Sequence, residues 1–279
     1  SFLFSEDPYV RLWKVWVEKF YLTDFWFKSF DDPKVLTAIC KPHVTFPEFL
    51  STIASKKYLD NPASLNTYWR PQSKLCDICS LSPTFVGKME TFEEDTRCIL
   101  KMTNYTWAVI PEDKRGLNHL STLALSMAPF KHRPSALRGM RTLAQENFAR
   151  WTSDPLVRDC ITLTDLVKRL WSAFQSLGYL PTRTAVPPYL LGKTIEEINV
   201  EMILVECVLA MRHWPGSTAR AKQYLRENEF RNTVAKAYTN VGTELLAKLQ
   251  ALYSEDFQTL DYKPQPLDMY FERYLSDDS

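Results

Sequence analysis

Two of the six cysteines stand close enough together in the sequence to share a chemical task. Cys76 and Cys79 form a C-x-x-C pair, a spacing found in zinc sites, thioredoxin-like redox centres and disulfide-bonded loops. A zinc site needs a second pair of ligands at suitable spacing, and a redox centre needs a strand before the pair and a helix after it. The sequence offers neither, so structural disulfides or plain thiols are favoured and no metal ion is expected.

The glycines and histidines exclude three other kinds of site. The seven glycines lie at least 14 residues apart, whereas a G-x-G-x-x-G dinucleotide loop and a G-x-x-x-x-G-K-[ST] phosphate loop need closer pairs. Gly192-Lys193-Thr194 resembles the end of a phosphate loop, but Pro187 stands where its first glycine belongs, so the segment is predicted to start a helix. The four histidines are at least 13 residues apart, which excludes an H-E-x-x-H metalloprotease helix.

The start of the chain offers another place for an anion. A strand is predicted over residues 1–5, and a helix follows because Asp7 is a good N-cap and Pro8 suits the first helical position. A helix N-terminus carries free N–H groups and a partial positive charge, to which Arg11 would add. Glu6 and Asp7 at the same place would repel a phosphate. These physical considerations alone favour a core helix that Asp7 caps.

Cap residues and apolar spacing predict the remaining elements, which are mostly helical in the second half of the chain. Residues 31–82 are expected to be mostly irregular. In chain order the expected elements are a helix from Pro8 to about residue 20, a short helix at Pro47–Lys56, a strand at Phe85–Met89, a helix from a capping box at Thr91–Glu94 through Leu100, a strand at Tyr105–Ile110, an apolar helical stripe from Leu163 to Leu177 ending at Gly178, a helix at Ile195–Met211 behind a capping box of Thr194 and Glu197, and a long helical stripe from Phe230 to Leu252.

The composition is that of an ordinary folded protein. The chain has 279 residues, of which 45% are hydrophobic and 24% charged, and this length suits one large domain or two small ones. Its 34 Lys and Arg against 33 Asp and Glu give a net charge of +1, so no global basic field points to nucleic acid. No membrane span is predicted, because the best apolar stretch, Ile198–Met211, is too short and contains two glutamates.

Three stretches of the chain carry a family resemblance. They are Asp7–Leu12 followed by Lys19-Phe20; the ordered series Val44–Leu50, Asn66–Trp69, Leu75–Cys79 and Phe85–Asp95; and Tyr253–Phe257 followed by Tyr262. In this order they resemble R-x-P-x-x-R-L-x-S-x-Y, V-T-F-x-E-F-L, N-x-H-W, L-C-x-x-C, V-G-K-x-E-T-x-E-E-D and Y-x-x-D-F of the Golgi carbohydrate sulfotransferase family, which includes the chondroitin and dermatan 4-O-sulfotransferases. The resemblance is strong over residues 1–100 and 245–262 and weak between 101 and 240.

The resemblance implies an α/β fold, here in a helix-rich form with a short central parallel sheet flanked by helices. The family's basic strand and loop for the 5′-phosphosulfate belong before Ser1, so the chain is expected to be a fragment without that first strand and loop. Residues 1–262 would form the sulfotransferase-like domain, and residues 263–279 would form a polar tail.

The reaction that the resemblance implies is transfer of sulfate from the donor PAPS to a hydroxyl of a glycan, such as a glycosaminoglycan or an N-glycan. Arg11 and Lys14 would hold the 3′-phosphate of the donor, and Lys88 and Arg70 are weaker candidates for contacts to the acceptor or another anion. Tyr68 stands where the family has a histidine, a candidate general base toward the acceptor hydroxyl. An unperturbed tyrosine, with a pKa of about 10, is a poor base near neutrality.

The resemblance also implies residence in the Golgi lumen, although the family's membrane anchor is not in this chain. An even number of cysteines and the N-glycosylation sequence at Asn104 point the same way. The candidate disulfide cysteines are Cys40, Cys76, Cys79 and Cys98.

Two departures from the family pattern concern the same phosphate. Glu6 replaces an arginine and Lys14 replaces a serine, and both positions face the 3′-phosphate in the family. We expect Glu6 and Lys14 to pair with each other and fill the anion site; alternatively, Lys14 and Arg11 still hold the phosphate while Glu6 turns away. With Tyr68, these departures leave three possibilities: an active sulfotransferase, a non-catalytic relative that binds glycan or a partner enzyme, or an unrelated helical interaction protein whose partner face is Phe230–Leu252.

Overall fold

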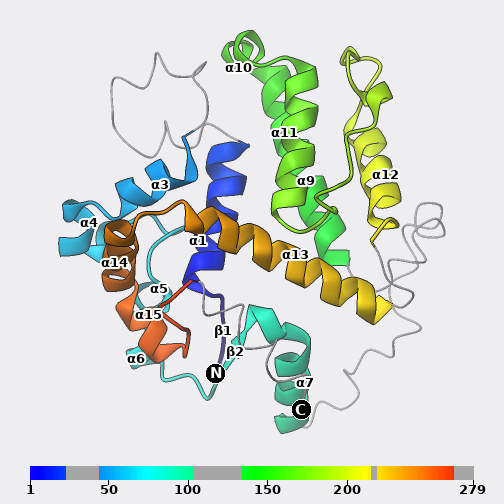
Figure 1. The fold of residues 1–279 in the computed structure, drawn as a ribbon. Coiled ribbons are helices and arrows are strands. Elements are labelled where there is room, and N and C mark those ends of the chain that lie inside the picture. The colour runs from blue at the N-terminus through cyan, green and yellow to red at the C-terminus, as the bar shows by residue number, and fades with distance from the viewer. Residues whose placement is uncertain (23–43, 104–133, 215–218, 267–279) are drawn as a thin grey trace.

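Strands β1 (Phe2–Ser5) and β2 (Phe85–Lys88) pair in parallel, so that Phe2 lies opposite Phe85 and Ser5 opposite Lys88. They form the sheet of a helix-rich computed structural model (Figure 1), and the expected fold class is confirmed. The residues that the structure describes are 1–22, 44–103, 134–214 and 219–266. The strand predicted at Tyr105–Ile110 lies outside them.

The sheet is close-packed at Gly87. A Cβ atom on this residue would lie 2.6 Å from Cε1 of Phe4, whose ring packs against Phe92 at a centroid distance of 4.8 Å. Glycine therefore allows the Phe4 ring to pack closely against strand β2.

Helix α1 (Pro8–Trp16) begins where the sequence predicts. The carboxylate of Asp7 accepts hydrogen bonds from the backbone N–H groups of Tyr9 and Val10, at 2.8 and 3.2 Å. The helix continues as a π-helical turn, Val17–Tyr21, so the helix expected to about residue 20 is confirmed with a wider last turn.

The segment from residue 44 to residue 103 is more helical than the sequence predicts. Its elements are α3 (Phe46–Ile53), α4 (Lys56–Asp60), a 3-10 turn at Pro62–Ser64, α5 (Gln72–Cys76), α6 (Ile78–Leu81), a 3-10 turn at Met89–Thr91 and α7 (Phe92–Met102). The prediction of mostly irregular structure over residues 31–82 is wrong for the described part, 44–82. The one helix predicted there, at Pro47–Lys56, corresponds to α3, which buries Phe49, Leu50 and Ile53. The unpredicted helices α4 and α5 have five residues each and bury no apolar side chain, so no apolar spacing marks them.

Helix α7 begins at the predicted place, but the predicted capping box at its start does not form. The Thr91 hydroxyl donates to Oδ2 of Asp95 at 2.7 Å instead of accepting from a helix N–H. The same carboxylate oxygen accepts from the backbone N–H of Lys88 at 2.7 Å, which ties the start of α7 to the end of β2.

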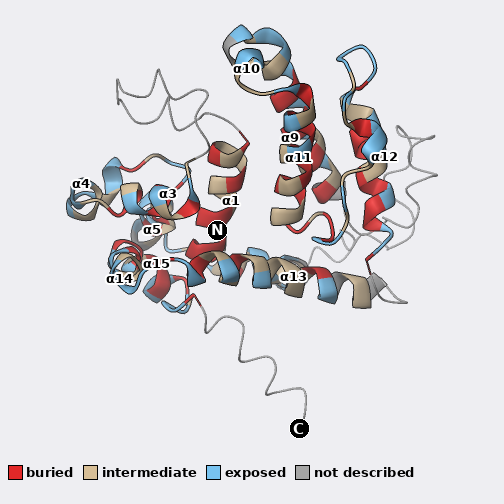
Figure 2. Cartoon of the chain, turned by 45° about the horizontal axis from the view of Figure 1, so that its top comes forward, coloured by how far each residue is buried: buried red, intermediate tan, exposed pale blue. Residues whose placement is uncertain are grey.

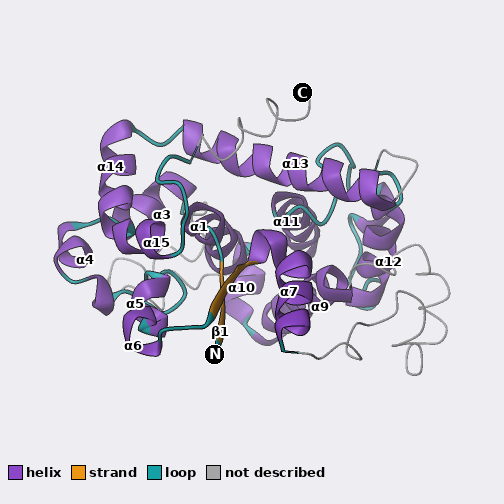
Figure 3. Ribbon diagram, turned by 90° about the horizontal axis from the view of Figure 1, so that it is seen from below, coloured by secondary structure: helices purple, strands orange, loops and turns teal. Residues whose placement is uncertain are grey.

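The second half of the chain is helical, as predicted. Its elements are α9 (Pro134–Ser153), α10 (Pro155–Cys160), α11 (Leu163–Ser176), a 3-10 turn at Pro188–Leu190, α12 (Val200–Met211), α13 (Ala219–Thr239), α14 (Thr243–Leu252) and α15 (Ser254–Thr259). Helix α13 runs from α14 toward α12, as Figures 1 and 3 both show, and lies along one side of the molecule in the view of Figure 3.

Two helix boundaries in this half differ from the predictions. Glu197 accepts from the backbone N–H of Thr194 at 2.9 Å, but this contact closes a turn, and α12 starts only at Val200, with Asn199 as its N-cap. The stripe Phe230–Leu252 is interrupted between α13 and α14, where Gly242 becomes the N-cap of α14. Apolar spacing alone did not reveal this break.

One hydrophobic core joins the two halves, with buried faces on α1 and α11 (Figure 2). The Phe46 ring contacts Trp13 and Tyr238 edge-on, both at 5.1 Å between centroids, and so links α3, α1 and α13. Indole Nε1 of Trp13 donates to the carbonyl of Ser176 at 2.9 Å, at the end of α11. Within the described ranges, no helix combines the length and apolarity that crossing a bilayer requires.

Candidate functional site

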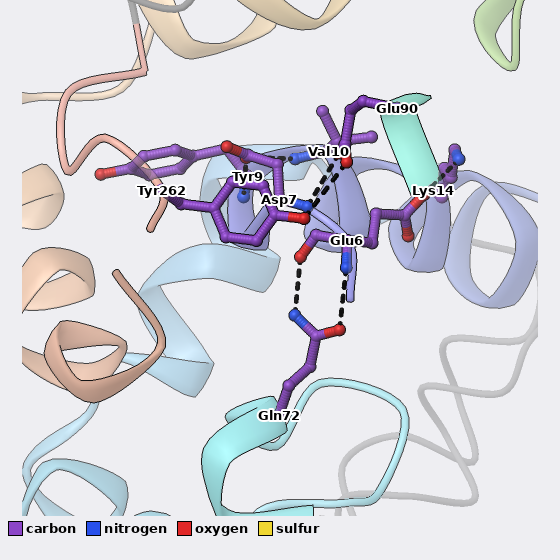
Figure 4. A network of polar contacts seen from close by, with 8 residues as sticks. All are labelled: Glu6, Asp7, Tyr9, Val10, Lys14, Gln72, Glu90 and Tyr262. Carbon is purple, nitrogen blue, oxygen red and sulfur yellow. Dashed lines mark hydrogen bonds and ion pairs between the residues drawn. The ribbon is translucent and has the colours of Figure 1, made fainter. Parts of the chain in front are cut away.

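The connections that leave the two parallel strands meet at one edge of the sheet. Strand β1 leads through Glu6 and Asp7 into α1, and strand β2 leads through Met89–Thr91 toward α7. Ligands of α/β proteins bind outside the carboxyl ends of parallel strands. Figure 4 shows the polar network that fills this edge.

Glu6 and Lys14 form an ion pair in this network, between the last residue before Asp7 and the second turn of α1. The side chain of Glu6 is 18% exposed and that of Lys14 is 36% exposed, so the pair is partly shielded from water. Burial lowers the pKa of Lys14, but the charge and hydrogen bond of Glu6 outweigh it, and the pKa is raised overall. The predicted pairing of Glu6 with Lys14 is confirmed.

The backbone of Glu6 is held in place by a single side-chain amide. Its N–H donates to Oε1 of Gln72 at 3.0 Å, and its carbonyl accepts from Nε2 of Gln72 at 2.6 Å. Asp256, which is fully buried, accepts in turn from the backbone N–H groups of Gln72 and Ser73, both at 2.7 Å. Asp256, in the stretch Tyr253–Phe257 that resembles Y-x-x-D-F, thus caps α5. Gln72 in turn fixes the turn between β1 and α1.

Asp7 brings a second carboxylate to the same edge. Its backbone N–H donates to Oε1 of Glu90 at 2.9 Å, and Oε2 of Glu90 accepts from the Tyr262 hydroxyl at 3.1 Å. The pKa of Asp7 is raised to about 7: burial is the largest cause, the charges of Glu90 and Glu6 add to it, and the hydrogen bonds from the backbone N–H groups of Val10 and Tyr9 oppose it. The first free N–H groups of α1 are therefore occupied by the protein's own acidic side chain.

Arg11 contacts neither of these carboxylates. Its Nη1 donates to the carbonyl of Arg70 at 2.6 Å and its Nη2 to the carbonyl of Thr67 at 3.0 Å, while Nε of Arg70 donates to the carbonyl of Leu65 at 2.9 Å. Arg11 and Arg70, both candidate anion contacts, thus meet at the loop Leu65–Arg70. There they hold backbone carbonyls.

Tyr68 lies on that loop and is 44% exposed. The ammonium group of Lys19, from the π-helical turn, lies 4.9 Å from the centroid of its ring. The backbone N–H of Tyr68 donates to Oδ1 of Asn66 at 3.0 Å. The structure places this candidate catalytic side chain beside Lys19, a residue that the sequence analysis did not single out as a site residue.

Lys88, the other candidate anion contact, lies at the end of β2 and bonds to the C-terminal segment. Its ammonium group donates to the carbonyl of Asp261 at 2.7 Å and lies 4.8 Å from the ring centroid of Tyr262. Lys88 therefore fixes this segment beside Glu90.

The structure tests the disulfide prediction at two of the four candidate cysteines, Cys76 and Cys98, and contradicts it at both. Cys76 and Cys98 carry free thiols, so the expectation of disulfides at these two positions is wrong in this structure. Cys76 lies at the end of α5 and Cys98 is exposed on α7. Cys40, Asn104 and the side chain of Cys79 lie outside what is described. Across the described residues there is no group of three or more His, Cys, Asp or Glu side chains that would hold a metal ion.

Three residues of this network, Gln72, Glu90 and Tyr262, were not predicted from the sequence. Gln72, the first residue of α5, carried no signal, because a single glutamine has no characteristic spacing. Glu90 and Tyr262 lay within the resembling stretches, but only the fold brings them to Asp7.

The comparisons with known proteins agree with this architecture. The chain is similar to carbohydrate sulfotransferase 12 of Xenopus laevis, with 33% identity over 122 residues (37% of this chain and 28% of that protein), and to its Mus musculus counterpart, with 31% over 117 residues (36% and 27%). It is also similar to carbohydrate sulfotransferase 14 of Homo sapiens, with 36% identity over 58 residues (21% and 14%).

These matches span less than a third of the length of each relative, and no solved structure matches the chain. The sequence model of the family described as "Sulfotransferase family" matches residues 1–154. This match covers more than half of the chain, including both strands, α1 and the Glu6–Lys14 pair, and the chain therefore belongs to the sulfotransferase family.

Proposed function

We propose that this protein takes part in the transfer of sulfate from PAPS to a hydroxyl of a glycan. The observation that carries the proposal is that the family match spans both strand-to-helix connections, at whose shared edge Lys14 and Lys88 lie. The names of the relatives, all carbohydrate sulfotransferases, support a carbohydrate acceptor. Family membership, with a parallel sheet beside α1, overturns the alternative of an unrelated helical interaction protein.

In this proposal the donor's 3′-phosphate is bound by Lys14 and Arg11. The 3′-phosphate takes no part in the bond changes, so these two cations would bind and position the donor, while the leaving group is its 5′-phosphate. Because Lys14 is paired with Glu6, donor binding requires Glu6 to move away, and a carboxylate beside the phosphate weakens the donor complex. Tyr68 is the proposed group nearest the acceptor hydroxyl. Lys88 and Arg70 are proposed as further anion contacts, and the Golgi lumen as the location.

The test is sulfate transfer from radiolabelled PAPS to unsulfated chondroitin, together with calorimetric binding of PAP, the product nucleotide. We expect transfer by the wild-type chain, a loss of PAP affinity of about tenfold or more in Lys14→Gln, and tighter PAP binding in Glu6→Gln. Lys248→Gln is the matched control, because Lys248 also pairs with a glutamate but lies on α14. If neither the wild-type chain nor Glu6→Gln binds PAP, the donor part of the proposal fails.

A second candidate function is a non-catalytic relative that binds glycan or a partner enzyme. Two contacts favour it: Lys14 pairs with Glu6, and Arg11 donates to two backbone carbonyls. Both cations proposed to bind the phosphate are therefore already engaged within the protein. Glycan binding without PAP binding, in both the wild-type chain and Glu6→Gln, would establish this alternative.

A further inference from the structure

The loop Leu65–Arg70 presents an aromatic ring to solvent from a rigid frame. Tyr68 is 44% exposed, whereas the neighbouring Trp69 is 2% exposed and packs in the core. The carbonyl of Trp69 accepts a hydrogen bond from the buried hydroxyl of Tyr253. The loop is thus anchored on one side and displays Tyr68 on the other.

Side-chain contacts to the backbone fix the rest of the loop. Arg11 bonds to the carbonyls of Thr67 and Arg70, Arg70 bonds to the carbonyl of Leu65, and Asn66 accepts from the N–H of Tyr68. A ligand that binds a loop already held in one conformation loses little free energy in ordering it. The exposed ring of Tyr68 is therefore preorganised for binding.

The same loop gathers positive charge. Lys19 lies 4.9 Å from the Tyr68 ring centroid, and the guanidinium groups of Arg11 and Arg70 contact the loop through carbonyls, which leave their charges in place. Lys19 belongs to the π-helical turn Val17–Tyr21 that ends the first helix. Glu18 is the acidic neighbour of Lys19 on this turn; burial raises the pKa of its carboxyl group, and the charge of Lys19 opposes that rise.

We propose that Tyr68 and Lys19 form a binding subsite for an acidic glycan, in which the Tyr68 ring stacks on a sugar ring and Lys19 pairs with a sulfate or carboxylate group. A pyranose ring presents apolar C–H groups on its faces, which suit an aromatic surface, and an acidic glycan carries its charge at the rim of the same ring. This inference rests on the glycan acceptor of the proposed function. It assigns Tyr68 to acceptor binding through its ring, and its hydroxyl is not required.

The test measures direct binding of three oligosaccharides to the purified chain by calorimetry. They are a sulfated chondroitin hexasaccharide, its desulfated form, and neutral maltohexaose. We expect the sulfated hexasaccharide to bind most tightly and maltohexaose most weakly. Tyr68→Ala and Lys19→Gln should each weaken binding of the sulfated form by about five- to tenfold, while Tyr68→Phe, which keeps the ring, should bind within about twofold of the wild-type chain.

The chain offers matched controls for both positions. Lys57 lies 5.1 Å from the ring centroid of Tyr58 on α4, and Lys57→Gln removes a cation from a similar pair elsewhere. Tyr224 on α13 is 48% exposed, and Tyr224→Ala removes an equally exposed ring. Both controls should bind the sulfated hexasaccharide like the wild-type chain.

Two results would overturn the inference. In the first, Tyr68→Ala and Lys19→Gln bind the sulfated hexasaccharide as tightly as the wild-type chain. In the second, Tyr68→Phe loses as much affinity as Tyr68→Ala, because the hydroxyl and not the ring would then make the contact. Glycan binding without sulfate transfer leaves the subsite intact and counts against the proposed reaction, so the two failures are distinguishable.

Discussion

The carboxyl group of Asp7 is buried, so its effect on the free energy of unfolding depends on pH. Its pKa is raised from 3.8 to about 7, first by burial and then by Glu90 and Glu6. The folded state therefore binds a proton more readily than the unfolded state between these values. The contribution of Asp7 to stability is fully present below about pH 4 and is lost as the pH rises through 7.

Asp7→Asn should remove this pH dependence while it keeps a good N-cap. We expect the variant to gain stability over the wild-type chain between pH 5 and pH 8, by at most about 4 kcal/mol. Urea unfolding at both pH values measures the effect. If the two proteins lose stability in parallel over this range, the carboxyl of Asp7 is already ionised at pH 5 and the assignment fails.

At the scale of residues, one contact of the site was predictable, because two departures from the family pattern, Glu6 and Lys14, compensate each other in charge. Glu6 and Lys14 carry opposite charges at positions that face the same point in the family pattern, and they form an ion pair. The contacts of Arg11 were not predictable, because their acceptors are backbone carbonyls about 60 residues away, at Thr67 and Arg70. A carbonyl leaves no signature in a sequence.

At the scale of elements, the sheet depends on a glycine. Gly87→Ala would place a methyl group 2.6 Å from the Phe4 ring, which Phe92 holds from another side. We expect a loss of about 1–3 kcal/mol in the free energy of unfolding. Phe4→Leu in the same chain should recover part of the loss, because the smaller side chain makes room. Gly242→Ala is the control for added volume, since no heavy atom lies within 4 Å of its new Cβ; it should cost less than about 1 kcal/mol, the difference between glycine and alanine at the N-cap of α14. Equal effects of the two alanine variants in urea unfolding would refute the packing argument.

Elements with strong local signals were predictable and those with distant partners were not. Asp7 and Pro8 fixed the start of α1, and the apolar stripe from Leu163 fixed α11. The short helix α5 is capped by Asp256, 183 residues from Ser73, and no local pattern in its sequence shows that cap. The break between α13 and α14 was missed because the apolar spacing continues across it.

At the scale of the whole molecule, the predicted boundary between the domain and its polar tail can be tested. The carbonyl of Pro264, two residues beyond Tyr262, accepts hydrogen bonds from the Tyr9 hydroxyl and from Nε2 of Gln250. We expect a chain that ends at Tyr262 to be less stable than one that ends at Pro266, by about 1–3 kcal/mol, because the part-buried Tyr9 hydroxyl loses its acceptor. Equal thermal midpoints would support the predicted boundary at residue 262.

The contacts of β1 and α1 also bear on the order in which the chain folds during its synthesis. Ser5 meets the hydroxyl of Tyr262 at 3.1 Å, and the carbonyl of Tyr9 accepts from Tyr238 at 3.0 Å, across 257 and 229 residues. A ribosome adds about 5–20 residues each second, so the first strand and helix wait many seconds for these partners. During that time Ser5 and Tyr9 lack these two hydrogen-bond partners. The beginning of this chain therefore completes its folding only after Tyr238 and Tyr262 have been synthesised.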